Sequence, residues 1–180
     1  MKLANSFHKL LNLIDNYFFS GFLGEMPNDI WSSLYTSWLK LAGAKIGKGS
    51  KVHHSVKVWF PENISIGREV RIPASTDMAG MGRISIGDFV LIGANVDFIT
   101  NHHPVGNEKL EQSEILRGTQ SSISVGNNVW IMNGAKLVGG KKGLSIGDHS
   151  WIATGAVVVK DIHPHQLWGG IPAQRIKDLQ

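Results

Sequence analysis

Two adjacent histidines, His102 and His103, are the side chains of this sequence best suited to proton transfer at neutral pH. Free histidine has a pKa of about 6.5, so its neutral ring can accept a proton from an attacking hydroxyl group. Pro104 follows the pair, within the polar stretch "ITNHHPVGNEKLEQSEILRGTQSSIS". The histidines act either as a general base or as solvated loop residues. Metal ligation is disfavoured, because no His or carboxylate pair at ligand spacing accompanies them.

The composition narrows the classes of protein to consider. The 180 residues include no cysteine, which excludes disulfides, zinc–thiolate sites and a cysteine nucleophile. The chain is compatible with a reducing compartment, and we expect it in the cytoplasm. The net charge is +4, without a basic run or a basic-aromatic alternation. A nucleic-acid partner is therefore not expected.

The histidine pair interrupts a repeat. The motif Ile/Leu-Ser-Ile/Val-Gly occurs four times, with its glycine at 67, 87, 126 and 147, so the intervals are 20, 39 and 21 residues. Apolar residues also recur every six positions in five rows: Ile46, Val52, Val58; Ile66, Ile72, Met78; Ile86, Ile92, Phe98; Val125, Ile131, Leu137; and Ile146, Ile152, Val158. This spacing predicts a β-helix in which each coil has three short strands. The long middle interval predicts an excursion loop over residues 99–122 that carries the histidines.

The first 43 residues differ in kind from the rest. Apolar residues recur there at helical spacing, in two sets: Phe7, Leu10, Leu11, Ile14 and Phe18, then Trp31, Leu34, Tyr35, Trp38 and Leu39 after a candidate cap at Asn28. We predict two amphipathic helices over residues 1–43, followed by a β-helix domain over residues 44–180 with a C-terminal tail at 161–180. The helices either pack against protein, which we favour, or lie peripherally on a membrane.

Three stretches resemble the hexapeptide-repeat acyltransferases, specifically the galactoside, maltose and nodulation-factor acetyltransferase group: "ISIGDFVLIGANVDFITNHHPV", "ISVGNNVWI" and "SWIATGAVVVKDIHPHQLWGGIPAQRIK". The resemblance implies an all-β fold, a left-handed parallel β-helix of about five coils, in a homotrimer with active sites between subunits. It also implies acetyl-CoA as the acyl-donor cosubstrate and no metal. The N-terminal region is similar to the subgroup that acetylates bacterial surface polysaccharides, such as colanic acid acetyltransferase.

The same resemblance assigns roles to individual residues. The family's base precedes a proline, so the match falls on His103, with His102 as the alternative. Contacts to the coenzyme fall on Trp130, Asn133, Gly134, Ala153, Thr154, Lys160, Arg175 and Lys177. The family's acceptor-orienting residue, usually Asn, is absent from "RIPASTDMAGMGR", where Ser75, Thr76 or Asp77 could substitute.

The sequence is compatible with two classes of function. The first is an acetyl-CoA-dependent O-acetyltransferase that acts on a sugar hydroxyl by direct transfer with a histidine base, in surface polysaccharide biosynthesis. The second is a metal-dependent β-helix of the carbonic anhydrase kind or a noncatalytic scaffold. The "HPV" loop and the "GGIPAQRI" tail favour the first. Three histidines converging across a subunit interface would favour the second.

Overall fold

A computed structural model describes residues 28–78, 81–102 and 119–180 of the chain. The first predicted helix and the histidine His103 lie outside the described residues. The elements in chain order are α3 (Asn28–Leu41), β1 (Lys45–Ile46), β2 (Lys51–Val52), β3 (Lys57–Val58), the 3₁₀ helix η2 (Pro61–Asn63), β4 (Ile64–Ile66), β5 (Arg71–Ile72), β6 (Asp77–Met78), β7 (Ile84–Ile86), β8 (Leu91–Ile92), β9 (Asp97–Ile99), β10 (Asn101–His102), β11 (Thr119–Gln120), β12 (Ile123–Val125), β13 (Trp130–Ile131), β14 (Lys136–Val138), β15 (Leu144–Ile146), β16 (Trp151–Ile152), β17 (Val157–Val158), β18 (Gln166–Gly170) and β19 (Ala173–Asp178).

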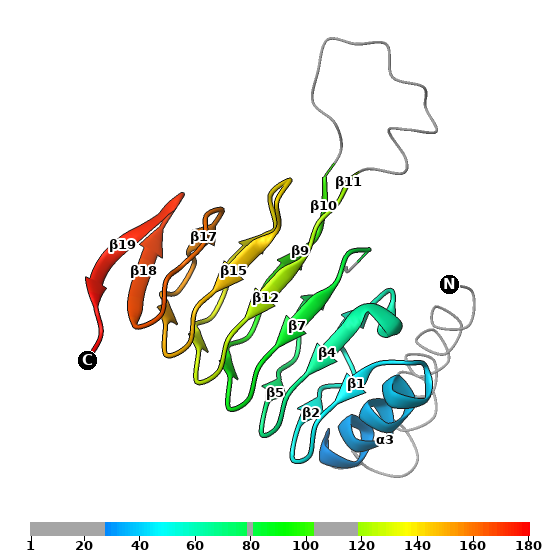
Figure 1. The fold of residues 1–180 in the computed structure, drawn as a ribbon. Coiled ribbons are helices and arrows are strands. Elements are labelled where there is room, and N and C mark those ends of the chain that lie inside the picture. The colour runs from blue at the N-terminus through cyan, green and yellow to red at the C-terminus, as the bar shows by residue number, and fades with distance from the viewer. Residues whose placement is uncertain (1–27, 79–80, 103–118) are drawn as a thin grey trace, which may run out of the picture.

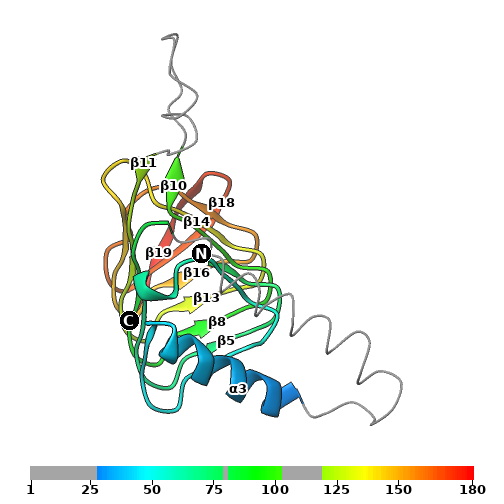
Figure 2. The same cartoon turned by 90° about the vertical axis from the view of Figure 1, so that its right-hand side faces the viewer.

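The short strands stack into three sheets around a common axis (Figure 1). We name them sheet A (β1-β4-β7-β12-β15), sheet B (β2-β5-β8-β13-β16-β18-β19) and sheet C (β3-β6-β9-β14-β17). Each strand pairs in parallel with its copy one coil later, so that Ile66 lies opposite Ile46 and Ile86 opposite Ile66. Seen along the axis, the coils form a three-sided prism (Figure 2). The predicted left-handed parallel β-helix of five coils is confirmed.

The six-residue rows form the core, as predicted. Thirteen of the fifteen row residues are buried, and Ile46 and Val58 of the first coil are half-buried and pack against them. The repeated glycine has a steric cause, because a Cβ at Gly87 would lie 2.6 Å from the carbonyl oxygen of Gly126 in the next coil. Only glycine therefore allows the coils to stack at the spacing that their hydrogen bonds require.

Helix α3 covers the open end of the first coil. The Tyr35 hydroxyl donates to the Val56 carbonyl at 2.8 Å, and the Val52 amide donates to Thr36 Oγ1 at 2.9 Å. Burial of Tyr35 raises the pKa of its phenol well above the ordinary value. The helix buries this side, so Leu34, which the pattern assigned to the apolar face, is instead 55% exposed. Among the described residues, no helix combines the length and the apolar character that crossing a membrane requires.

The predicted tail at 161–180 forms an ordered hairpin at the other end. Strand β18 pairs in parallel with β16, and β19 turns back to pair with β18 in antiparallel fashion. Sheet B is thereby two strands longer than sheets A and C. The hairpin covers the last coil on one side of the prism (Figure 1).

Candidate active site

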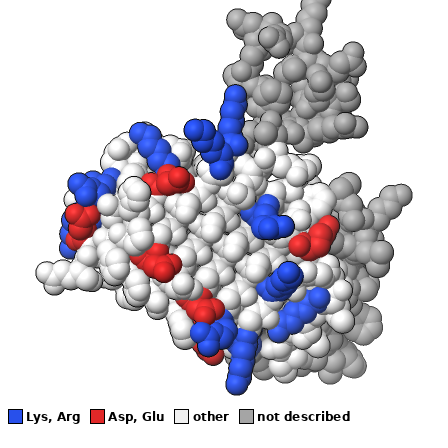
Figure 3. Space-filling model, in the orientation of Figure 1, with Lys and Arg blue, Asp and Glu red and all other residues white. Residues whose placement is uncertain are grey.

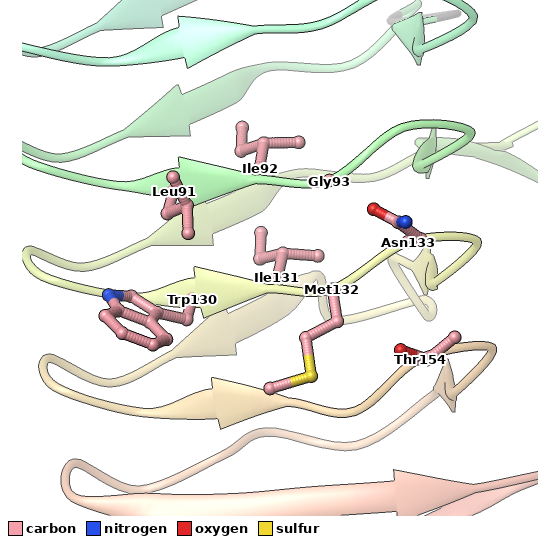
Figure 4. A pocket seen from close by; sticks show the side chains of 8 residues that line it. All are labelled: Leu91, Ile92, Gly93, Trp130, Ile131, Met132, Asn133 and Thr154. Atoms are coloured by element: carbon pink, nitrogen blue, oxygen red, sulfur yellow. The ribbon is translucent and has the colours of Figure 1, made fainter.

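A cavity of about 330 Å³ opens where sheet B turns into sheet C, a position that we call the BC corner. The third, fourth and fifth coils contribute to it from equivalent positions, so the cavity runs along the axis of the prism (Figure 4). Its lining residues are Leu91, Ile92, Gly93, Trp130, Ile131, Met132, Asn133 and Thr154. Three of the predicted coenzyme contacts, Trp130, Asn133 and Thr154, are therefore brought together.

An apolar wall on the outer face of sheet B flanks the cavity. Strand alternation buries Ile131 and turns Trp130 outward, where it is 43% exposed. Its indole stacks on that of Trp151 one coil later, with ring centroids 4.7 Å apart and planes within 4°. Leu91 precedes Trp130 in the same register, and Leu167 of the hairpin follows Trp151. These four side chains form a continuous strip, which we call the outer apolar strip.

Backbone contacts fix the shape of the BC corner. Asn133 Oδ1 accepts from the Ala94 amide at 3.0 Å, and the Gly155 amide donates to the Asn133 carbonyl at 2.9 Å. Gly134 has a φ of +73°, a conformation that L side chains rarely adopt. Ala153 lies in the same corner and donates its amide to the Trp168 carbonyl at 2.8 Å. Hydrogen bonds to the preceding and the following coil thus stabilise the corner at Asn133, and the side-chain oxygen of Asn133 is engaged in one of them.

Two of the predicted phosphate-binding cations, Arg175 and Lys177, lie on β19 at the hairpin end of the strip. Lys177 is opposite Leu167, which is opposite Trp151, so three strand spacings of about 4.8 Å separate Lys177 from Trp130. Arg175 is exposed and pairs with Asp178, with 3.0 Å between Nη1 and Oδ1. Lys160 is exposed but lies elsewhere, in the turn between β17 of sheet C and Ile162, which bridges to Ile146 of sheet A. A long ligand could therefore place its apolar part on the outer apolar strip and its anionic end near the cations of β19.

The candidate acceptor residues do not line the cavity. Ser75 lies in the BC corner of the second coil, with a φ of +60° and its amide 3.4 Å from Ser55 Oγ. Asp77 lies on sheet C opposite Asp97. Thr76 is 1% exposed and points into the core, which removes it as a ligand contact.

The excursion leaves the prism at a different corner. Strands β10 and β11 pair in antiparallel fashion and project from the position where sheet C turns into sheet A, the CA corner (Figure 2). His102 ends β10, and residues 103–118 lie outside the described residues. The cavity and the root of the excursion are therefore on different edges of one chain.

The described residues contain no group of three or more His, Asp or Glu side chains that could hold a metal. Two histidine pairs do occur. His53 stacks on His54 with centroids 4.2 Å apart, and His149 stacks on His165 at 4.8 Å. In the described ranges neither pair is part of a group of three or more such side chains, and His53 Nδ1 lies 2.8 Å from Ser55 Oγ.

Sequence reasoning missed Leu91, Gly93 and Met132 as cavity residues. The signal was present in the six-residue spacing, because Leu91 precedes the inward Ile92 as Trp130 precedes the inward Ile131. Met132 and Gly93 follow those inward residues at the start of the corner. Aligning equivalent positions of successive coils would therefore have predicted that these residues lie side by side along the prism.

Comparison with known sequences identifies relatives among acetyltransferases. No sequence model of a protein family matches the chain. The chain is 34% identical to galactoside O-acetyltransferase of Escherichia coli over 143 residues. This aligned region covers 79% of this chain and 68% of that protein. Over 120 residues it is 39% identical to the sophorolipid acetyltransferase of Starmerella bombicola, of which it spans 44%.

Solved structures agree with these relatives. A hexapeptide-repeat acetyltransferase from Vibrio cholerae, in complex with acetyl-CoA, has a TM-score of 0.78 and 26% identity and covers 99% of this chain and 88% of its own. A maltose O-acetyltransferase from Clostridium difficile has a TM-score of 0.73 at 24% identity, over 100% of this chain and 90% of its own, which supports the fold. The prediction of an acyltransferase is confirmed. The chain belongs to the galactoside O-acetyltransferase family of hexapeptide-repeat acetyltransferases.

Proposed function

We propose that the protein transfers an acetyl group from acetyl-CoA directly to a hydroxyl group of a sugar. The observation that carries this proposal is the cavity at the BC corner, whose outer apolar strip leads to cations on the hairpin. Acetyl-CoA is the donor, in keeping with family membership and with the acetyl-CoA complex of the Vibrio relative. The names of the relatives, which mention galactosides and a sophorolipid, support a saccharide acceptor.

The donor lies along the axis of the prism. Its pantetheine arm packs against Leu91 and Trp130, and its amides contact Thr154 and the amide nitrogen of Asn133, whose oxygen already holds the corner. Gly134 and Ala153 contribute backbone groups. The phosphates extend toward Arg175 and Lys177 on the hairpin, because charge-assisted hydrogen bonds favour that end, and Lys160, in the turn from sheet C to sheet A, is the third predicted contact.

His103 is the general base, with His102 as the alternative. The base removes the proton of the acceptor hydroxyl while its oxygen attacks the thioester carbonyl. The tetrahedral intermediate then collapses, the carbon–sulfur bond breaks, and the protonated histidine returns its proton to the departing thiolate. The products are the acetyl ester and free coenzyme A, and no bond to the enzyme forms.

The active site is shared between copies in a homotrimer. The excursion leaves at the CA corner and the cavity lies at the BC corner, so the His103 of one copy serves the cavity of the next. A head-to-tail arrangement of this kind closes into a ring when the rotation between copies divides a full turn, as it does in a trimer. Ser75 and Asp77, on the same edge as the cavity, contact the acceptor.

The biological setting is part of the proposal. We place the enzyme in the cytoplasm, in surface polysaccharide biosynthesis, with residues 1–43 as a helical appendage and residues 44–180 as the catalytic domain. The absence of cysteine supports a reducing compartment.

An assay of acetyl transfer from acetyl-CoA to sugars, nucleotide sugars and lipid-linked oligosaccharides tests the reaction. The shared site is tested by co-expressing His103→Ala chains with Thr154→Trp chains, whose added bulk fills the cavity. Each variant alone is inactive, and random mixing restores about one quarter of the sites. If neither the wild type nor the mixture forms an acetyl ester, the proposed reaction is wrong. If the wild type is active and the mixture is inactive, the reaction stands and only the shared active site is refuted.

A further inference from the structure

Helix α3 presents an apolar stripe on the side that faces away from the β-helix. Ile30, Leu34 and Leu41 are 47%, 55% and 88% exposed. Their spacing of four and seven residues puts them on one side of the helix, opposite the buried Tyr35 and Leu39. A row of large exposed apolar side chains usually marks an interaction surface.

The net charge of the chain is concentrated around this stripe. The segment 28–60, which begins with α3, contains five lysines and one acidic residue, Asp29, whereas residues 61–180 contain eleven basic and eleven acidic residues. The lysines are Lys40, Lys45, Lys48, Lys51 and Lys57. Figure 3 shows basic side chains gathered over the first coils, at the lower right, while basic and acidic side chains alternate at the other end.

The geometry leaves three of these lysines available to a ligand. Lys40, Lys45 and Lys48 are exposed, and no acidic side chain in the described ranges pairs with them. Helix α3 packs on β1 and β2 at the end of the prism, so its outer side faces along the axis (Figure 2). A flat anionic surface across this end could contact the stripe and the surrounding lysines together.

We propose that this end of the molecule docks α3 on an anionic lipid surface. Apolar burial and lysine attraction to acidic headgroups are each weak, and peripheral proteins combine them. A second copy is a poor occupant, because face-to-face contact would oppose five lysines with five lysines. Docking here leaves the cavity of the third to fifth coils open.

Co-sedimentation of the full chain with lipid vesicles tests this proposal. We expect binding to phosphatidylcholine vesicles that contain about 30 mol % phosphatidylglycerol, and much weaker binding to pure phosphatidylcholine. Salt at about 0.5 M NaCl should release most of the protein, because it screens the lysines.

Paired variants localise the contact. Lys45→Gln with Lys48→Gln should weaken binding about fivefold for each lysine, and Leu34→Ser with Leu41→Ser should weaken it at least about tenfold. The matched controls are Lys141→Gln with Lys142→Gln, and Ile171→Ser with Ile176→Ser, which change exposed residues elsewhere. Circular dichroism verifies that each variant is folded.

Three results overturn the proposal. The first is no binding to anionic vesicles. The second is lipid binding that the control variants weaken as much as the α3 variants do, or that none of these variants weakens. Either outcome would place the lipid contact elsewhere in the chain. The third is a lower sedimenting mass for Leu34→Ser with Leu41→Ser in the absence of lipid, which identifies the stripe as an interface between copies.

Discussion

The two ends of the β-helix have the same interior and different exteriors. On sheet B, Val52 of the first coil and Ile152 of the fifth are both fully buried. The residues just before them, Lys51 and Trp151, point outward. Alternate residues of one strand therefore have separate roles. The inward residues form the core at both ends, whereas the outward residues make the first coil basic and the fifth coil apolar beside the cavity.

The largest expected effect lies in the excursion, which belongs to neither end. His103→Ala should lower kcat by about 10² to 10⁴-fold, because a general base contributes this much, while the midpoint of thermal unfolding stays unchanged. Steady-state kinetics of His103→Ala and His102→Ala measure it. If His102→Ala shows the larger loss, the base is His102.

The separate roles of inward and outward residues can be tested on one strand, β13. Ile131→Ala should lower the free energy of unfolding by about 2–5 kcal/mol through the cavity it leaves. The neighbouring Trp130→Ala should instead raise the KM for acetyl-CoA about tenfold and change stability by less than about half the Ile131→Ala effect. Urea unfolding at fixed protein concentration and donor titrations separate the two.

The other end of sheet B supplies the matched pair for this test. Val52→Ala should destabilise as an inner substitution does, and Lys51→Ala should leave the KM for acetyl-CoA unchanged. A donor KM that rises equally in Lys51→Ala and Trp130→Ala would show that the two exteriors are not specialised.

A smaller effect sharpens the assignment of the phosphate-binding cations. Lys160→Ala and Arg175→Ala should each weaken acetyl-CoA about tenfold and leave acetyl-pantetheine, which lacks the nucleotide phosphates, nearly unaffected. Competition measurements with both donors provide the readout. Equal losses with the two donors place these cations away from the phosphates.

The smallest effect is expected at an exposed contact between the second and third coils. The Arg68 guanidinium donates to Asp88 at 2.7 Å and lowers the pKa of that carboxyl. Because the folded pKa lies below the unfolded one, this stabilisation is present above about pH 4 and is lost as pH falls through the folded pKa. Asp88→Asn should therefore lower the thermal midpoint slightly at pH 7, and the difference should disappear in acid. A difference that persists at pH 2 contradicts this origin.

The interior was predictable because it repeats. One residue type at one position in each coil gives a periodic signal, so all fifteen row residues were assigned to the core from spacing alone. The pairing of Trp130 with Trp151 followed from the same register. The family resemblance, not the spacing, provided the handedness of the helix.

The exterior was harder to predict because it depends on single contacts. Leu34 fits an apolar helical pattern, but Tyr35 and Thr36 find polar partners on Val56 and Val52 and so turn Leu34 outward. The hairpin of β18 and β19 was missed because its strands carry no six-residue period. Ser75 and Asp77 were chosen because the family resemblance implies an acceptor-orienting residue in this stretch, and whether they contact the acceptor stays a prediction.

The antiparallel turn at the end of sheet B also protects the edge of that sheet against end-to-end association with another copy. A solenoid of parallel coils that ended at β16 would offer its backbone to the first coil of another copy, and chains could join end to end as in fibrils. Strand β18 occupies that backbone, and β19 reverses direction, so a further parallel coil finds no matching register. The outer strand carries Arg175, Lys177 and Asp178, and charged residues on an edge strand discourage pairing with another copy.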